Sequence, residues 1–325
     1  MIRREEASHM SKKPKVFIDG QEGTTGLQIY DRLAAREDIE LLRIDPDKRK
    51  DSAERAKLMN GADLVFLCLP DQAAREAVEL VTNEHTKIID ASTAHRIAPG
   101  WVYGFPELLA GQRQRVKFAR RVANPGCHAT GFLSSAAPLA AMGMLPKDAP
   151  VSCYSLTGYS GGGKKMIAQY EGDKTEDLFS PRTYSLGLDH KHLPEMIKYA
   201  GLKHPPVFCP VVDDYYKGME TVVMLENRFL KGTPTAEDVC EMLAAYYEGE
   251  TLVQVAPFGR HPAQMAANAM AGRDDLRLYV CGNGDSTVVV AVFDNLGKGA
   301  SGAAVQNMNL MLGFAETAGL ALGRQ

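Results

Sequence analysis

The sequence predicts an α/β protein, in which a doubly wound parallel sheet is followed by an α+β unit with a mixed or antiparallel sheet. Over the first 124 of 325 residues, short apolar runs alternate with stretches whose apolar residues recur at helical spacing. A glycine-rich turn separates the first apolar run from the first helical stretch. After residue 150, strand-like runs follow one another with few helices between them, which is typical of α+β units.

The alternation in the first unit predicts parallel strands joined by helices, as in Rossmann-type folds. Leu27, Tyr30 and Leu33 share one face of the first predicted helix. Further helices are expected up to Asn60 and up to about Thr82. The predicted strands of this unit are Lys15–Asp19, Ile39–Ile44, Ala62–Leu69 and Lys87–Asp90.

The second unit is expected to begin near Asn124-Pro125-Gly126, where a turn sequence interrupts the apolar pattern. A final helix, from about Ala300 to Leu322, closes the chain. The predicted strands of this unit are Val151–Thr157, Val207–Asp213, Met219–Arg228, Leu252–Ala256, Leu276–Gly282 and Thr287–Asp294.

Composition narrows the function classes. The formal net charge of −3 gives no reason to expect nucleic acid or an acidic membrane as partner. No apolar run approaches the ~18 residues that a membrane span needs, and the amino terminus lacks the apolar core of a secretory signal, so a cytoplasmic protein is expected. The six cysteines include no closely spaced pair, so neither a zinc site nor any other metal is expected. Residues 1–10 are interpreted as a tag or a disordered start.

The glycine turn has the spacing Gly20-x-x-Gly23-x-x-Gly26, with Thr24 and Thr25 inside it. At the start of a helix, free backbone N–H groups and the helix dipole favour a pyrophosphate, and glycine lets the ligand approach the backbone. These five residues are therefore candidates for binding a dinucleotide. The alternative is a tight strand–helix turn without a ligand.

The choice of dinucleotide depends on the residues after the second strand. Asp45 would hold an adenine ribose and favour NAD, whereas Lys48 and Arg49 would hold a 2′-phosphate and favour NADP. A solvated turn is the third interpretation of this charge cluster. We favour NADP.

Cys127 is the one cysteine with unusual surroundings. It follows the turn Asn124-Pro125-Gly126 and precedes a largely buried helix from Ala129 onward, which places it at a helix amino terminus. The helix dipole there is expected to stabilise the thiolate, which is the nucleophilic form. The pattern favours a nucleophile, with a structural cysteine as the alternative.

A histidine cluster supplies candidates for proton transfer. In His190-Lys191-His192-Leu193-Pro194-Glu195, Pro194 suits the first turn of a helix, and Glu195 is spaced to orient the His192 imidazole. We expect general acid–base catalysis from one of these histidines. A metal site and a plain surface helix are the alternatives, and no nearby cysteine or acidic cluster supports a metal.

These motifs occur together in a known order, and the chain resembles the N-acetyl-γ-glutamyl-phosphate reductases over about residues 15–313. The likeness to the shorter, second type of this enzyme comes from 90–96 and 103–108. Two departures from the longer type are His128, where a tyrosine is usual, and a Gly-Gly-Gly-Lys loop in place of Gly-Ala-Gly-Arg. The matching segments are Asn124-Pro125-Gly126-Cys127, Ser160-Gly161-Gly162-Gly163-Lys164, His190-x-His192-x-x-Glu195, Asp294–Ala300 and Val305–Met311.

The resemblance implies the fold of aspartate-semialdehyde and glyceraldehyde-3-phosphate dehydrogenases, NADP(H) as cofactor, an acyl-phosphate substrate, and a homodimer or homotetramer. It implies a dinucleotide-binding domain at 11–124, completed by a carboxy-terminal helix at 300–325. The catalytic and oligomerisation domain would be 125–299.

Site roles follow from the same resemblance. Cys127 is the expected nucleophile and His192 the expected acid–base, with His190 and Glu195 binding substrate or orienting His192. The cofactor site is expected to include Ser92, Gly161, Gly162 and Asn295, and the substrate site Arg96, Asn124 and Lys164, with Arg260 as a further anion-binding candidate.

The implied reaction is NADPH-dependent reduction of N-acetyl-glutamyl 5-phosphate to the 5-semialdehyde through a Cys127 thioester, in arginine biosynthesis. The rival hypotheses are a related reductase that acts on aspartyl phosphate and a non-catalytic nucleotide-binding regulator.

Overall fold

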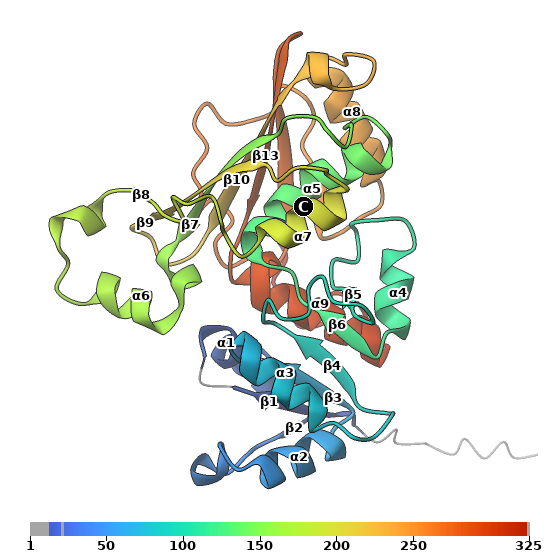
Figure 1. Cartoon of the computed structure of the whole chain (residues 1–325), viewed down its shortest axis with the longest axis vertical. Coiled ribbons are helices and arrows are strands. Elements are labelled where there is room, and N and C mark those ends of the chain that lie inside the picture. The colour runs from blue at the N-terminus through green and yellow to red at the C-terminus, as the bar shows by residue number, and fades with distance from the viewer. Residues whose placement is uncertain (1–12, 21–22, 324–325) are drawn as a thin grey trace, which may run out of the picture.

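The computed structural model describes residues 13–20 and 23–323, without the side chains of Thr24 and Leu27. The expected tag at 1–10 lies outside this range. The described chain contains two separate sheets, and one lies above the other in the view of Figure 1. Among the described residues, none of the helices combines the length and the hydrophobicity that a membrane span requires.

The first sheet is parallel throughout and covered on both faces, as predicted for a doubly wound fold. Alternate residues of one strand face opposite sides, so Val16 and Ile18 pack on one face and Phe17 packs on the other. Two strands, β5 and β6, were not among the predicted ones. The strand order is β2 (Glu40–Leu42), β1 (Lys15–Asp19), β3 (Leu64–Leu67), β4 (Lys87–Asp90), β6 (Arg121–Ala123) and β5 (Val102–Tyr103).

Helices cover the two faces of the first sheet in separate groups. Ile29 and Leu33 of α1 share one apolar cluster with Val116 of α4, whereas Met59 of α2 and Ala77 of α3 belong to the cluster on the opposite face. The helices are α1 (Thr24–Ala34), α2 (Ser52–Gly61), α3 (Asp71–Glu79) and α4 (Gln112–Phe118).

The second sheet is mixed, as the sequence predicts. All six predicted strands are present within a few residues of their expected ends, and the two-residue edge strand β8 is an addition. The strand order is β11 (Val253–Val255), β12 (Leu276–Gly282), β13 (Ser286–Phe293), β10 (Met219–Glu226), β7 (Ser152–Gly158), β9 (Val207–Asp213) and β8 (Arg182–Thr183).

One face of this sheet packs against the central helix α5 (Cys127–Ala141), with α7 (Leu193–Ala200) and α8 (Ala236–Tyr246) beside it. All of α5 from His128 to Leu139 is buried. The helix α6 (Gly163–Glu171) lies apart from these, in a lobe that projects from one end of the sheet (Figure 1).

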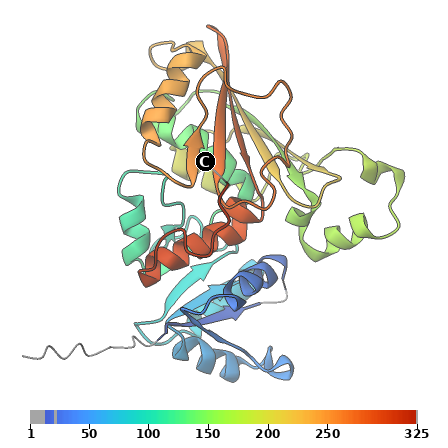
Figure 2. The ribbon, with the colours of Figure 1, turned by 180° about the vertical axis from the view of Figure 1, so that it is seen from behind.

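The predicted final helix is wrong in length. A π-helical turn at Gly297–Ser301 leads into α9, which spans only Gly302–Leu312. Gly313 adopts the left-handed conformation, and the Phe314 N–H bonds the Asn309 carbonyl, a glycine helix stop. The helix α9 packs against α4, β4 and α1, and it lies between the two sheets in Figure 2.

Candidate active site

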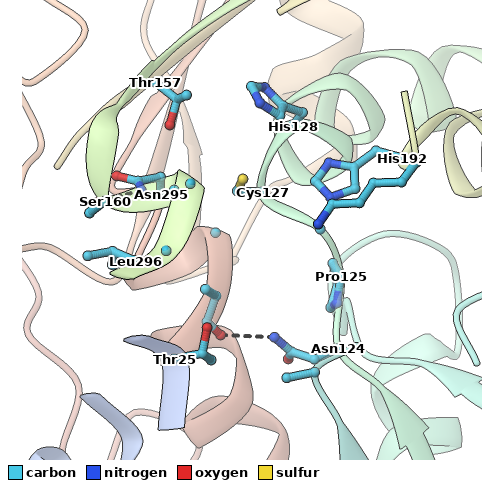
Figure 3. A pocket seen from close by; sticks show the side chains of 18 of the residues that line it. Thr25, Asn124, Pro125, Cys127, His128, Thr157, Ser160, His192, Asn295 and Leu296 are labelled. Carbon is cyan, nitrogen blue, oxygen red and sulfur yellow. Dashed lines mark hydrogen bonds between the residues drawn. The ribbon is translucent and has the colours of Figure 1, made fainter. Parts of the chain in front are cut away.

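A cavity of about 400 Å³ lies where the two units meet. Its walls come from the start of α1, the start of α5, the loop before α6, the histidine cluster and the segment before α9. Figure 3 shows Cys127 between His128 and His192 on one side and Ser160 and Asn295 on the other. The cavity therefore brings together residues that lie far apart in the sequence.

Cys127 is the first residue of α5, as predicted, and Gly126 is the N-cap. Its side chain is partly buried and lines the cavity. The π-helical turn before α9 packs closely against Cys127, since a Cβ on Gly299 would lie 3.0 Å from the Cys127 Cβ. Cys127 is thus held at a helix start with its sulfur directed into the cavity (Figure 3).

The expected stabilisation of the thiolate is outweighed in the ligand-free protein. Burial raises the pKa of the Cys127 thiol, and this effect exceeds the lowering by the Arg96 charge, the His128 backbone N–H and the Lys191 charge. The helix start therefore reduces the cost of ionisation without removing it. At neutral pH the resting sulfur is a thiol.

His192 lies next to the nucleophile because Gly126 has no side chain. A Cβ on Gly126 would lie only 2.4 Å from His192 Nε2 and 2.4 Å from Arg96 Nη1. Burial, with the Arg96 charge second, lowers the pKa of His192 well below its usual value, so the imidazole is neutral. Its buried Nδ1 has no hydrogen-bond partner within the described residues. The neutral imidazole is in the protonation state that can accept a proton from the thiol, although the two pKa shifts oppose that transfer.

His190 and His128 complete a cluster of three imidazoles. The ring of His190 lies 4.7 Å from that of His192 and 5.2 Å from that of His128, and its Nδ1 accepts a hydrogen bond from the His192 backbone. Burial lowers the pKa of His190 to about 4, and it also lowers the pKa of His128 well below its usual value. His128 bonds Ser155 at 2.9 Å and Tyr184 at 2.7 Å through its two ring nitrogens. His128 is therefore fixed by the protein.

The prediction that Glu195 orients His192 is not supported by the contacts. Its carboxylate instead accepts hydrogen bonds from Arg96 Nη1 at 2.6 Å, the Tyr103 hydroxyl at 2.6 Å and the Gly126 N–H at 3.2 Å. All of these groups are buried. The first turn of α7 directs Glu195 toward the first unit, so it ties the turn before Cys127 to Arg96.

The predicted phosphate-binding turn reaches the cavity through Gly23, Thr25 and Gly26. Gly20 has a packing role, because its φ is +84° and a Cβ there would lie 2.4 Å from the Cys68 carbonyl oxygen. The Thr24 side chain lies outside the described structure. The residues that do line the cavity present glycine backbone at the start of α1, which fits a dinucleotide pyrophosphate.

Several other expected cofactor residues lie away from the cavity. Lys48 belongs to a short 3-10 turn after β2, and Arg49 follows it; neither lines the cavity. The Ser92 hydroxyl donates to Asp90 at 2.7 Å and accepts from the Ala94 N–H, so it braces the end of β4.

The glycine loop before α6 forms the opposite wall. Gly161 and Gly162 line the cavity, and the Asn295 side chain holds the loop by donating to Ser160 Oγ at 3.0 Å and accepting from the Gly218 N–H. Lys164, one residue into α6, does not line the cavity.

Two further residues that were expected to bind substrate, Asn124 and Arg260, have a different place or different partners in the structure. Asn124 lines the cavity, but its amide donates to the Ala300 carbonyl at 2.9 Å and accepts from Asn307 at 3.1 Å, so it ties the end of β6 to the segment around α9. Arg260 lines a separate groove with Gln254 and Arg277.

Sequence reasoning missed three residues at the site. Lys191 and Tyr184 line the cavity, and Tyr103 bonds Glu195. Only Lys191 had a sequence signal, its position between the two histidines. Among the described residues, no group of three histidine, cysteine or acidic side chains is placed to hold a metal.

Comparison with known families gives the class to which the chain belongs. Residues 15–116 match the family described as semialdehyde dehydrogenase, NAD binding domain, and residues 127–295 match the semialdehyde dehydrogenase dimerisation domain. Solved structures share the fold: aspartate semialdehyde dehydrogenase II from Vibrio cholerae has a TM-score of 0.69 at 17% identity, covering 93% of this chain and 99% of that one. The fold and site thus define a protein of the semialdehyde dehydrogenase class.

Closer relatives narrow the class further. N-acetyl-γ-glutamyl-phosphate reductase 2 of Nostoc sp. is 48% identical over 95% of this chain and 99% of its own length. The reductase of Brucella anthropi is 48% identical over 93% of this chain and 99% of its own. The chain belongs to the N-acetyl-γ-glutamyl-phosphate reductase family, which confirms the resemblance seen in the sequence.

Proposed function

We propose that this chain reduces N-acetyl-γ-glutamyl phosphate to N-acetyl-glutamate semialdehyde and phosphate, an NADPH-dependent step of arginine biosynthesis. The observation that carries the proposal is Cys127 at the start of α5, facing the cavity, with the neutral imidazole of His192 against the preceding glycine. The glycine backbone at the start of α1, which lines the same cavity, supports NADPH as the cofactor.

The chemistry begins with proton transfer from the Cys127 thiol to His192 as the sulfur attacks the carbonyl carbon. A carbon–sulfur bond forms, the carbon–oxygen bond to phosphate breaks, and His192 passes its proton to the departing phosphate. NADPH, when bound, supplies the hydride that reduces the resulting thioester. Hydride addition leaves a tetrahedral oxyanion on the substrate carbon. The carbonyl then re-forms as the carbon–sulfur bond breaks, and Cys127 leaves as a thiolate that takes up a proton from water. Splitting the reaction at a thioester lowers each barrier.

The neighbouring groups prepare these steps. Glu195 bonds both the Gly126 N–H and Arg96, so it fixes the peptide that precedes the nucleophile. His190 accepts from the backbone of His192 and holds that residue at the start of α7. Asn295 fixes the glycine loop opposite Cys127, where the nicotinamide ring would bind.

We also propose a homodimer or homotetramer assembled through 125–299, because residues 127–295 match a domain described as a dimerisation domain. The dinucleotide domain would comprise 11–124 and the last helix. A cytoplasmic location is consistent with all six cysteines being free thiols.

The test is the reverse reaction with purified protein. Phosphate-dependent NADPH formation should be at least about a hundredfold more efficient with N-acetyl-glutamate semialdehyde than with aspartate semialdehyde, since the pocket must accommodate the acetamido group. A preference for aspartate semialdehyde, or no phosphate-dependent turnover with either, would contradict the proposal.

A further inference from the structure

Few charged side chains line the cavity, and those that do are positively charged. Apart from the histidines, Arg96 and Lys191 are the two basic side chains among its lining residues, and no carboxylate lines it within the described structure. An acyl-phosphate substrate is strongly anionic, and a bound phosphate needs cationic or N–H partners. The two cations are therefore the first groups to consider for the phosphoryl oxygens.

Arg96 is largely occupied by the protein. Its Nη1 donates to Glu195 at 2.6 Å, its Nε to the Asn124 carbonyl at 3.0 Å, and its Nη2 lies 3.4 Å from the Ala91 carbonyl. The Arg96–Glu195 pair is buried and has no net charge. Arg96 alone cannot balance a phosphate dianion.

Lys191, in contrast to Arg96, is not engaged by other described groups of the protein. It lies between the buried His190 and His192, and it is exposed. Its ammonium makes no ion pair or hydrogen bond with any residue that the structure describes. Its charge lowers the pKa of the Cys127 thiol and acts on His190 and His192, and it also lowers the pKa of the exposed carboxyl group of Asp71. An unpaired cation thus faces the reacting groups.

The position of this charge distinguishes between the two anionic ends of the substrate. The phosphoryl group is joined through one bridging oxygen to the carbon that Cys127 attacks, whereas the carboxylate lies at the far end of the carbon chain. We propose that Lys191 binds the phosphoryl group of the substrate and stabilises the phosphate as it leaves. This assignment rests on the proposed function and adds a phosphate site to it.

The experiment uses the reverse reaction, in which inorganic phosphate is a substrate with its own KM. Lys191→Met should raise the KM for phosphate at least about tenfold, the loss of one charge-assisted hydrogen bond. The KM values for semialdehyde and NADP+ should stay within about twofold of wild type, since uniform effects would indicate a structural change. Lys191→Arg should recover most of the phosphate affinity. Lys203→Met, an exposed lysine outside the cavity, is the matched control.

The possible outcomes distinguish a failure of the Lys191 assignment from a failure of the proposed function. An unchanged KM for phosphate in Lys191→Met overturns the assignment, and so does a rise confined to the semialdehyde, which would place the carboxylate at Lys191. A wild-type enzyme without phosphate-dependent turnover overturns the proposed function and this assignment with it. A thermal melting curve matching wild type shows that the variant is folded, as an exposed position predicts.

Discussion

Arg96 and Glu195 form a buried ion pair, with 2.6 Å between Nη1 and Oε1, that joins the first unit to the start of α7 beneath the nucleophile. Removing one partner of a buried pair leaves the other charge uncompensated. Glu195→Gln should therefore lower the free energy of unfolding by about 3 kcal/mol. Denaturant titration measures this, with the exposed Glu237→Gln expected to match wild type. A Glu195→Gln protein as stable as wild type would show that the pair contributes nothing.

Replacing the nucleophile should separate binding from chemistry. Cys127→Ser is expected to bind NADPH as wild type does and to lose turnover by at least about a thousandfold, because a serine hydroxyl is far less readily ionised. Fluorescence titration with NADPH and the reverse assay supply the two readouts. Turnover near the wild-type level would eliminate the thioester route.

The histidines should differ in their contribution. His192→Asn should reduce kcat by about 100- to 10,000-fold, the usual contribution of a general base. His190→Asn should have a smaller effect, because His190 contacts the backbone of His192. If the larger loss falls on His190→Asn, the two roles must be exchanged.

Alkylation of the free enzyme should be slow at neutral pH. A thiol whose pKa is raised above its ordinary value is protonated at pH 7, so its reactivity climbs only as the pH rises through that higher pKa. Iodoacetamide labelling of Cys127, followed by mass spectrometry from pH 6 to 10, tests this. A plateau reached near pH 7 would mean that the resting sulfur is already a thiolate. Slow labelling at neutral pH thus does not argue for a non-catalytic protein.

Replacing Gly126 by alanine should lower the catalytic rate, because the site has no room for a side chain at this position. A methyl group in Gly126→Ala would collide with His192 and Arg96, and displacing catalytic groups by about 1 Å costs roughly 100-fold in rate. Gly61→Ala is the control, since nothing lies within 4 Å of a Cβ at the end of α2. Equal activity of the two variants would refute the packing argument.

The sequence was informative where the relevant physics is local. Cys127 at a helix start and the alternation of strands and helices are visible in residues close together along the chain. Glu195 shows the opposite case: its spacing from His192 suggested a contact, but its partners are Arg96 and Tyr103, which lie 99 and 92 residues away along the chain. Lys191 looks like any surface lysine until the fold places it on a cavity without carboxylates. The two-residue strands β5 and β8 are too short to leave a periodic signal.

The position of α9 has a consequence for how the protein is made. Ala304, Val305 and Met308 fill the core on one face of the first sheet, and the segment just before them packs behind Cys127. Because α9 follows both sheets along the chain, this face of the first sheet stays uncovered until the residues of α9 have been synthesised. The nucleophile cannot acquire its final surroundings until the segment before α9 has joined the fold, so its reactivity depends on contacts between distant parts of the chain.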